Sequence, residues 1–289
     1  MRIGARSAVL FLIFAIMFLA PTPRLVASGG VKSVAGFDQN HTAFDVLLKR
    51  YVHDGRVDYK GFKASEGGLN LYLKQLADVK PEQLSAWSDD EKLAFWINAY
   101  NAFTIKAILD NYPIRGGVLS IYPSNSIRQI DGVWDKLEFE AAGKPVTLNQ
   151  IEHGILRKEF KEPRIHFAIV CASVGCPLLK NESFKADEIR KQLDERARAF
   201  VNDPDKVMLK PGKDEVALSR IFKWFGGDFV PKFGNTGDFK RNNPKERAAL
   251  NFVKAHLLDG AEFDKFPKTR RIRVTYLPYD WSLNEQTHP

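Results

Sequence analysis

The 289-residue chain contains two cysteines, Cys171 and Cys176, with four residues between them. A cysteine thiolate attacks an amide or thioester carbonyl when a nearby base keeps it deprotonated and amide donors stabilise the oxyanion that forms. Glu152, His153 and His166 lie close to Cys171 in sequence and are candidates for that base or for the group that orients it. Our first hypothesis is therefore a thiol-dependent hydrolase or transferase with Cys171 as its nucleophile.

The two cysteines also fit a structural disulfide, which in an oxidising compartment would contribute about 2 kcal/mol by closing a short loop. A tetrahedral zinc site built from both cysteines with His153 and His166 is a third alternative, although a second cysteine pair is missing. The sequence carries no phosphate loop, dinucleotide fingerprint or serine nucleophile elbow. We therefore expect neither a metal nor a cofactor.

Several polar side chains fall on segments whose other residues are apolar. Buried polar groups need partners, and one polar cleft would supply partners for all of them. In the enzyme hypothesis, Asn98 and Arg164 position the substrate, and Glu152 or Asp280 orients His153. The residues predicted to contact the substrate are Asn98, Asn101, Arg157, Arg164 and Asp280.

The alternative function is a non-catalytic binding protein. Arg157 and Arg164 would then hold an anionic peptide, metabolite or envelope component, while Cys171 and Cys176 form a disulfide staple. Either hypothesis requires a small-molecule or peptide ligand as the partner. The two hypotheses require different states of the cysteines, because an enzyme needs a reactive thiol and the binding protein has a disulfide.

A helix over residues 89–111 is the clearest structural signal. Ser88 and Glu91 form a capping box, in which each side chain satisfies an amide at the helix start. The helix is apolar almost all round and must be central to the fold. Asn98 and Asn101 lie on one edge of it.

A second capping box, Thr147 with Gln150, predicts a helix that runs to about residue 160. His153 and Arg157 are four residues apart on this helix and share one face, with Glu152 beside them. The sequence therefore gathers three candidate site residues on one element.

Residues 165–170 predict a β-strand that ends at Cys171. Because strand side chains alternate between faces, a straight strand would place His166 and Cys171 on opposite sides. His153 is therefore an equally good candidate for the base.

Helical patterns outnumber strand patterns and do not alternate with them regularly, which favours a helix-rich α+β fold with a small, mainly antiparallel sheet. Residues 37–289 are expected to form a single domain. Further helices are predicted near 44–51, 69–76, 186–201, 221–225 and 245–258, and further strands at 207–209, 216–218 and 271–277.

The first 28 residues resemble an export signal. Arginines at positions 2 and 6 precede an apolar run over residues 8–20, and small residues follow it. This run is too short to span a bilayer as a helix. We expect cleavage near residue 28, a flexible leader over 29–36, and a periplasmic or extracellular protein with no transmembrane segment left after cleavage. Export would remove most nucleic-acid partners, so the net charge of +8 is not read as a nucleic-acid signal.

Six segments stand out together along the chain. They are Phe95–Ala102, Ile151–His153, Arg164–Ala168, Cys171–Ser173, Cys176–Pro177 and Tyr279–Asn284. Together they resemble the bacterial and plant domain-of-unknown-function family 547. The resemblance covers roughly residues 40–285 but implies little about function, because the family has no assigned activity. Its core resembles that of papain-like or transglutaminase-like cysteine hydrolases, in which the nucleophile usually begins a central helix; here that helix carries no cysteine.

Overall fold

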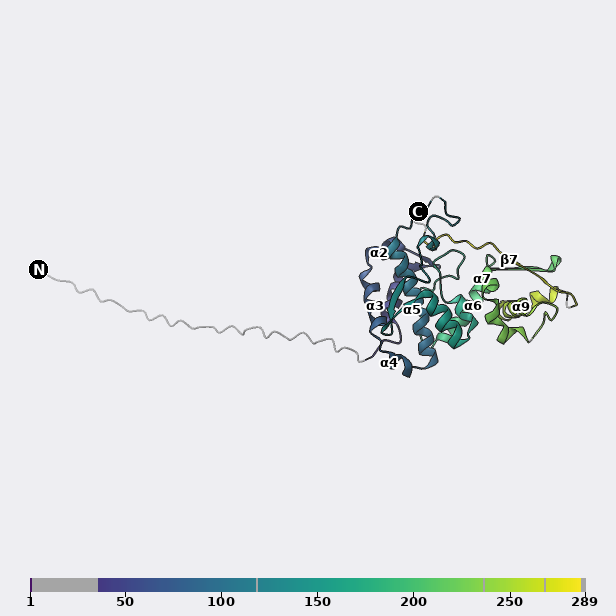
Figure 1. The fold of residues 1–289 in the computed structure, drawn as a ribbon, viewed down its shortest axis with the longest axis horizontal. Helices are drawn as coiled ribbons and strands as arrows, with labels where there is room; N and C mark the ends of the chain where they lie inside the picture. The colour runs from purple at the N-terminus through teal and green to yellow at the C-terminus, as the bar shows by residue number, and fades with distance from the viewer. Residues whose placement is uncertain (2–35, 118, 236, 268, 287–289) are drawn as a thin grey trace. The chain divides into compact units, whose positions relative to one another are not determined.

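The computed structural model describes Met1 and residues 36–117, 119–235, 237–267 and 269–286. The expected signal peptide and leader lie outside the described residues, apart from Met1 and Gly36. The chain from Phe37 onward forms one compact unit (Figure 1). Within the described part of the chain, we find no helix that is both long and apolar enough to cross a bilayer.

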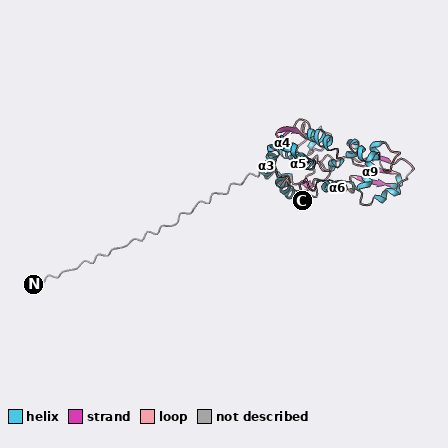
Figure 2. Ribbon diagram, turned by 90° about the horizontal axis from the view of Figure 1, so that it is seen from below, coloured by secondary structure: helices cyan, strands magenta, loops and turns pink. Residues whose placement is uncertain are grey.

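Helices predominate in this unit and the strands are short, so the predicted α+β class is confirmed (Figure 2). Its first part contains α1 (Thr42–Tyr51), α2 (Tyr59–Ala64), α3 (Gly67–Asp78), α4 (Pro81–Ala86), α5 (Asp89–Asn111), η1 (Ile127–Gln129), η2 (Gln150–Phe160) and η3 (Pro163–Phe167). Its second part contains α6 (Ile189–Val201), η4 (Pro211–Lys213), α7 (Arg220–Trp224), α8 (Gly226–Phe229), η5 (Val230–Gly234), α9 (Pro244–His256) and η6 (Gly260–Lys265).

The strands form small sheets. Two are hairpins, β1 (Val52–His53) with β2 (Arg56–Val57) and β3 (Glu138–Ala141) with β4 (Lys144–Thr147). The third has the order β5 (Val207–Lys210), β6 (Glu215–Leu218), β7 (Arg273–Tyr276). Strands β5 and β6 pair antiparallel as predicted, whereas β7 joins β6 in parallel.

Helix α5 is the centre of a first hydrophobic cluster. Its capping box forms as predicted: the Glu91 amide donates to Ser88 Oγ at 3.3 Å, and the Ser88 amide donates to the Glu91 carboxylate at 2.7 Å. Side chains all round the helix are buried, and α5 lies between α3 and α6 in Figure 1. The amphipathic neighbours α1 and α3 supply Phe44 and Leu69 to this cluster.

A second hydrophobic cluster contains side chains of α6, α7, α9 and the three-stranded sheet. Phe167, Phe222 and Phe252 pack against one another there, with ring centroids 5.3–6.1 Å apart. Aromatic rings in this arrangement add to the stability gained from burying their area. Phe167 belongs to η3, so η3 links this cluster to the segment that leads to the cysteines.

The predicted strand over residues 165–170 is wrong. The segment begins as the 3₁₀ helix η3, in which the Ala168 amide donates to the Ile165 carbonyl at 2.9 Å. Beyond η3, the Asn101 side chain bonds the Ala168 carbonyl and the Val170 amide, both at 3.0 Å. This side chain takes the donor and acceptor that a neighbouring strand would have paired.

Candidate functional site

A cavity of about 140 Å³ collects most of the chemically capable residues. Residues of both hydrophobic clusters contribute to its wall. A cavity of about 490 Å³ near Phe239 and Phe263 is larger, but none of the predicted site residues lines it. The smaller cavity is lined by Tyr100, Arg128, Trp134, Glu152, His166, Ile169, Cys171, Cys176, Pro177, Ile221, Trp224, Phe225, Tyr279 and Trp281.

Three predicted catalytic residues, Glu152, His166 and Cys171, therefore meet in one cavity. They come from η2, from η3 and from the loop that follows η3. The fourth, His153, is exposed and is not among the residues that line the cavity. Its Nδ1 lies 2.5 Å from Arg157 Nη1 instead.

The Glu152 carboxyl is the acid–base group of the cavity. Glu152 is only 8% exposed, and its carboxylate accepts a hydrogen bond from the Tyr100 hydroxyl at 3.3 Å. Burial raises the pKa of Glu152 from an ordinary 4.5 to about 7, although the charge of Arg157 and the Tyr100 hydrogen bond limit the rise. Near neutral pH both protonation states are populated, so this carboxyl can donate or accept a proton.

His166 is held in place by Asp228. Its Nε2 lies 2.8 Å from Asp228 Oδ2, and its ring stacks on Phe225 with centroids 4.0 Å apart. Burial lowers the pKa of His166, and the bond to Asp228 offsets part of that effect. Arg157 binds the same carboxylate through Nε at 2.6 Å and Nη2 at 2.8 Å.

Asp228 therefore stays ionised. Burial alone would raise the pKa of its carboxyl, but the hydrogen bonds from Arg157 and His166 hold that pKa below its usual value. Arg157 was predicted to bind a ligand anion; in the structure its Nε and Nη2 bind Asp228, and its Nη1 lies next to His153 Nδ1.

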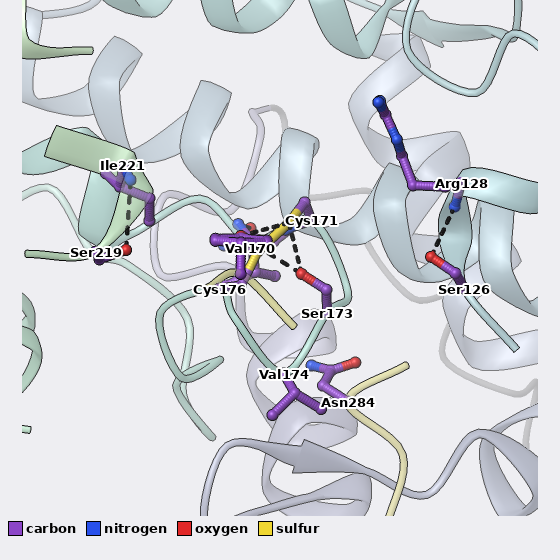
Figure 3. Close-up of a disulfide and its surroundings, with 12 residues drawn as sticks. Ser126, Arg128, Val170, Cys171, Ser173, Val174, Cys176, Ser219, Ile221 and Asn284 are labelled. Atoms are coloured by element: carbon purple, nitrogen blue, oxygen red, sulfur yellow. Dashed lines mark hydrogen bonds between the residues drawn. A yellow bond between two sulfur atoms is a disulfide. The ribbon is translucent and has the colours of Figure 1, made fainter. Parts of the chain in front are cut away.

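Cys171 and Cys176 are joined by a disulfide, with their Cα atoms 6.2 Å apart (Figure 3). Cys171 is half-buried, whereas Cys176 is only 3% exposed. The Tyr279 hydroxyl lies 3.2 Å from each sulfur, and the Ser173 hydroxyl lies 3.1 Å from the Cys171 sulfur. The nucleophilic thiolate predicted at Cys171 therefore does not exist while this bridge is closed.

Aromatic side chains make up much of the remaining wall, and Arg128 lies against them. The Arg128 guanidinium carbon is 4.6 Å from the Tyr122 ring centroid and 4.8 Å from that of Trp281. One of its nitrogens donates to the Tyr122 hydroxyl at 2.6 Å. Among the described residues, none of the carboxylates pairs with Arg128, so its charge is available to a ligand.

Comparison with known families gives one match. Residues 84–201 match the model described as "Protein of unknown function, DUF547". This segment of the chain is similar to the DUF547 family. No curated protein and no solved structure matches the chain. A papain-like or transglutaminase-like core therefore stays a prediction.

Nine of the fourteen residues that line the cavity lie within the DUF547 match. It contains the acid–base residue Glu152, both cysteines and Arg128, whereas Asp228 and Tyr279 follow it in the chain. The site is completed only when the segments on the C-terminal side of the DUF547 match fold back onto it.

The side chains of Asn98 and Asn101 form hydrogen bonds with backbone groups, and neither residue lines the cavity. Asn98 Nδ2 donates to the Phe184 carbonyl at 2.7 Å, and its Oδ1 accepts from the Phe184 amide at 3.0 Å. Asn101 makes the equivalent pair of bonds after η3. Each side-chain amide therefore bonds backbone through both its oxygen and its nitrogen, and the predicted contact with substrate stays a prediction.

Arg164 and Asp280 also have partners within the protein. The Arg164 guanidinium binds Glu162 at 2.7 Å and Asp194 at 2.8 Å, so two carboxylates neutralise it. The Asp280 carboxylate accepts from the Ser282 amide at 2.8 Å. Asp280 therefore shapes the C-terminal segment and does not orient His153.

Several residues of this site were not predicted from the sequence. The aromatic Tyr279 and Trp281 lie in a segment that carried the family resemblance, and that segment was a usable signal. Arg128 gave no signal, because its spacing to other polar residues is unremarkable in sequence. Asp228 lies 62 positions from His166, and no local pattern connects the two.

Proposed function

We propose that this protein is an exported binding protein for a small anionic ligand, with the aromatic cavity as its binding site. The observation that carries the proposal is Arg128, whose guanidinium is stacked on aromatic rings and unpaired with any described carboxylate while lining the same cavity as Glu152. An arginine in this setting favours carboxylate or phosphate groups. Trp281 and Trp134 beside it favour a planar or apolar ligand body.

Cavity size limits the ligand. Pockets for drug-sized ligands usually measure roughly 300–1,000 Å³, whereas this cavity measures about 140 Å³. A small metabolite or one end of a peptide fits this space. The protonated form of Glu152 would donate a hydrogen bond to an oxygen of the ligand, and its ionised form would accept one.

A ligand screen tests the proposal. The melting temperature of the protein is measured with small aromatic and aliphatic carboxylates and phosphates, each paired with its uncharged amide or ester. We expect the anions to raise the melting temperature and their neutral partners to have less effect. If the neutral compounds raise the melting temperature as much as the corresponding anions do, the proposal is contradicted.

A second candidate function is the thiol-dependent hydrolase or transferase. It is favoured by the meeting of Cys171, His166 and Glu152 in one cavity and by the bond between His166 and Asp228. In this reading His166 Nε2 is occupied by Asp228, and Nδ1 is the nitrogen left to take the proton of Cys171. The reaction requires the disulfide to be opened first.

This candidate is tested with the reduced protein on amide and thioester substrates. Turnover should depend on reductant and be abolished in Cys171→Ala. Full turnover by the Cys171→Ala protein would exclude Cys171 as the nucleophile.

A further inference from the structure

The Cys171–Cys176 disulfide differs from a simple staple in its position. Both cysteines line a cavity that holds an acid–base group and an aromatic wall. We propose that this disulfide is a thiol–disulfide exchange site for a small thiol that enters the cavity, with Cys171 as the sulfur attacked and Cys176 as the leaving group.

Exposure selects the sulfur that is attacked. Exchange proceeds by attack of a thiolate on one sulfur of the bridge, and access decides which one reacts. Cys171 is half-buried and Cys176 is 3% exposed. An incoming thiolate therefore reaches Cys171 first.

Two hydrogen bonds stabilise the Cys176 sulfur as the leaving group. The backbone amide of Cys171 donates to the Cys176 sulfur at 2.9 Å, and the Tyr279 hydroxyl donates to it at 3.2 Å. Donors to a sulfur favour its charged form, and a stabilised thiolate leaves faster. The Cys171 amide is a fixed donor because its direction is set by the backbone.

The loop does not depend on the bridge for its shape. The Val174 amide donates to the Ser282 carbonyl at 2.9 Å, and the Gly175 amide donates to the Asp280 carbonyl at 2.8 Å. On the other side, Lys206 Nζ donates to the Val174 carbonyl at 2.9 Å. With these anchors, opening the disulfide leaves the loop fastened and the cavity wall in place.

The small thiol gives its proton to solvent, its sulfur forms a new bond to Cys171 Sγ, and the Cys171–Cys176 bond breaks with its electron pair left on Cys176. The thiol sulfur is oxidised and Cys176 is reduced to a thiolate. A second thiol that attacks the mixed disulfide releases the small-molecule disulfide and leaves both cysteines reduced.

The experiment uses the full oxidised protein and 2-mercaptoethanol, which is uncharged. Samples are quenched with acid at intervals, and intact mass and peptide mapping give the rate of mixed-disulfide formation and its position. The matched control is the synthetic disulfide-closed peptide Cys-Ala-Ser-Val-Gly-Cys, which has the same loop without the cavity. We expect the folded protein to react about tenfold faster, the effect of one hydrogen bond to a charged group, with the adduct on Cys171.

Two variants separate leaving-group assistance from general stability. Tyr279→Phe keeps the ring and removes the hydroxyl, so exchange should slow about tenfold with little change in melting temperature. Tyr276→Phe, on β7 and outside the cavity lining, should react like the wild type.

Three results would overturn the proposal: a folded protein that reacts no faster than the peptide, an adduct on Cys176, or a Tyr279→Phe rate equal to that of the wild type. These outcomes are read from the rate and position of a covalent adduct, whereas anion binding at Arg128 is read from the melting temperature. Failure of the exchange proposal is thus distinguishable from failure of the binding proposal.

Discussion

At the scale of single residues, Glu152 shows how burial outweighs nearby charge. Arg157 lies close enough to lower the pKa of this carboxyl, and Tyr100 donates a hydrogen bond to it, yet burial still raises that pKa to about 7. The charge of Arg157 and the Tyr100 hydrogen bond only limit the rise, because burial is the largest effect on this pKa. The cavity therefore keeps a carboxyl that changes protonation near neutral pH.

This pKa predicts a pH-dependent cost in stability. Between pH 4.5 and 7 the folded state binds more protons at Glu152 than the unfolded state does, so the free energy of unfolding falls as pH rises through this window. The slope from this group approaches about 1.4 kcal/mol per pH unit. Glu152→Gln should remove that slope and gain stability relative to the wild type at pH 8 but not at pH 4.

Urea unfolding at both pH values measures this difference. Glu159→Gln, at an exposed position on the same helix, is the matched control and should follow the wild type. Equal wild-type and Glu152→Gln stabilities at pH 8 would contradict the assignment.

At the scale of elements, the main error in the predicted fold is the strand over residues 165–170. Side-chain hydrogen bonds there take the place of the bonds that a neighbouring strand would have made. Residues 165–170 have the apolar composition of a buried strand, and composition does not distinguish a strand from other fully buried segments. Glu162 caps the start of η3 by accepting from the Arg164 amide at 3.1 Å, and Asn101 then bonds the backbone that follows. Both interactions depend on tertiary contacts or side-chain geometry that periodicity does not reveal.

Elements with local signals were predicted well. The capping boxes at Ser88 and Thr147 place the starts of α5 and η2, because both partners of each box lie three residues apart. The two strands of the β5–β6 hairpin lie where strands were predicted, at 207–209 and 216–218. The pairing of His166 with Asp228 could not be predicted, because it depends on how two distant segments pack.

The structural role of Asn101 predicts a large loss of stability. Asn101→Ala leaves the Ala168 carbonyl and the Val170 amide buried without their partner. Each unsatisfied buried group costs roughly 1–3 kcal/mol, so we expect a loss of about 3 kcal/mol in the free energy of unfolding. Asn111→Ala, at the exposed end of the same helix, should cost less than 1 kcal/mol by the usual effect of surface substitutions. Similar losses in the two variants, measured by denaturant unfolding, would argue against this role.

At the scale of the whole molecule, buried histidines make the protein sensitive to acid. Burial lowers the pKa values of His41, His166 and His256, that of His41 from 6.5 to about 3. Below pH 6.5 the unfolded state binds protons that the folded state does not, so stability from these groups is complete above 6.5 and is lost as pH falls. The stability contributed by Glu152 changes with pH in the opposite direction, but this is one carboxyl, whereas three histidines contribute to the loss of stability in acid.

We therefore expect the urea midpoint of the wild type to fall between pH 6.5 and pH 5. In Glu152→Gln, which lacks the opposing carboxyl, the fall should be steeper. His53→Gln, at an exposed position, should leave the pH profile unchanged. A midpoint that is constant or rises over this range would contradict the prediction.

The cavity itself is a property of the whole molecule. Tyr100 and Ile169 belong to the first hydrophobic cluster, and Ile221, Phe225 and Tyr279 to the second, so both clusters must form before the site exists. Destabilising either cluster should therefore weaken ligand binding even where no cavity residue is changed.

The most direct measurement of the central proposal is calorimetric titration of the best anion from the screen into wild type, Arg128→Gln and Arg115→Gln. Arg115 is exposed and does not line the cavity, so its variant removes one positive charge from elsewhere on the surface. We expect at least a tenfold loss of affinity, about 1.4 kcal/mol, in Arg128→Gln and wild-type affinity in Arg115→Gln. Equal affinities in the two variants would contradict an anion site at Arg128.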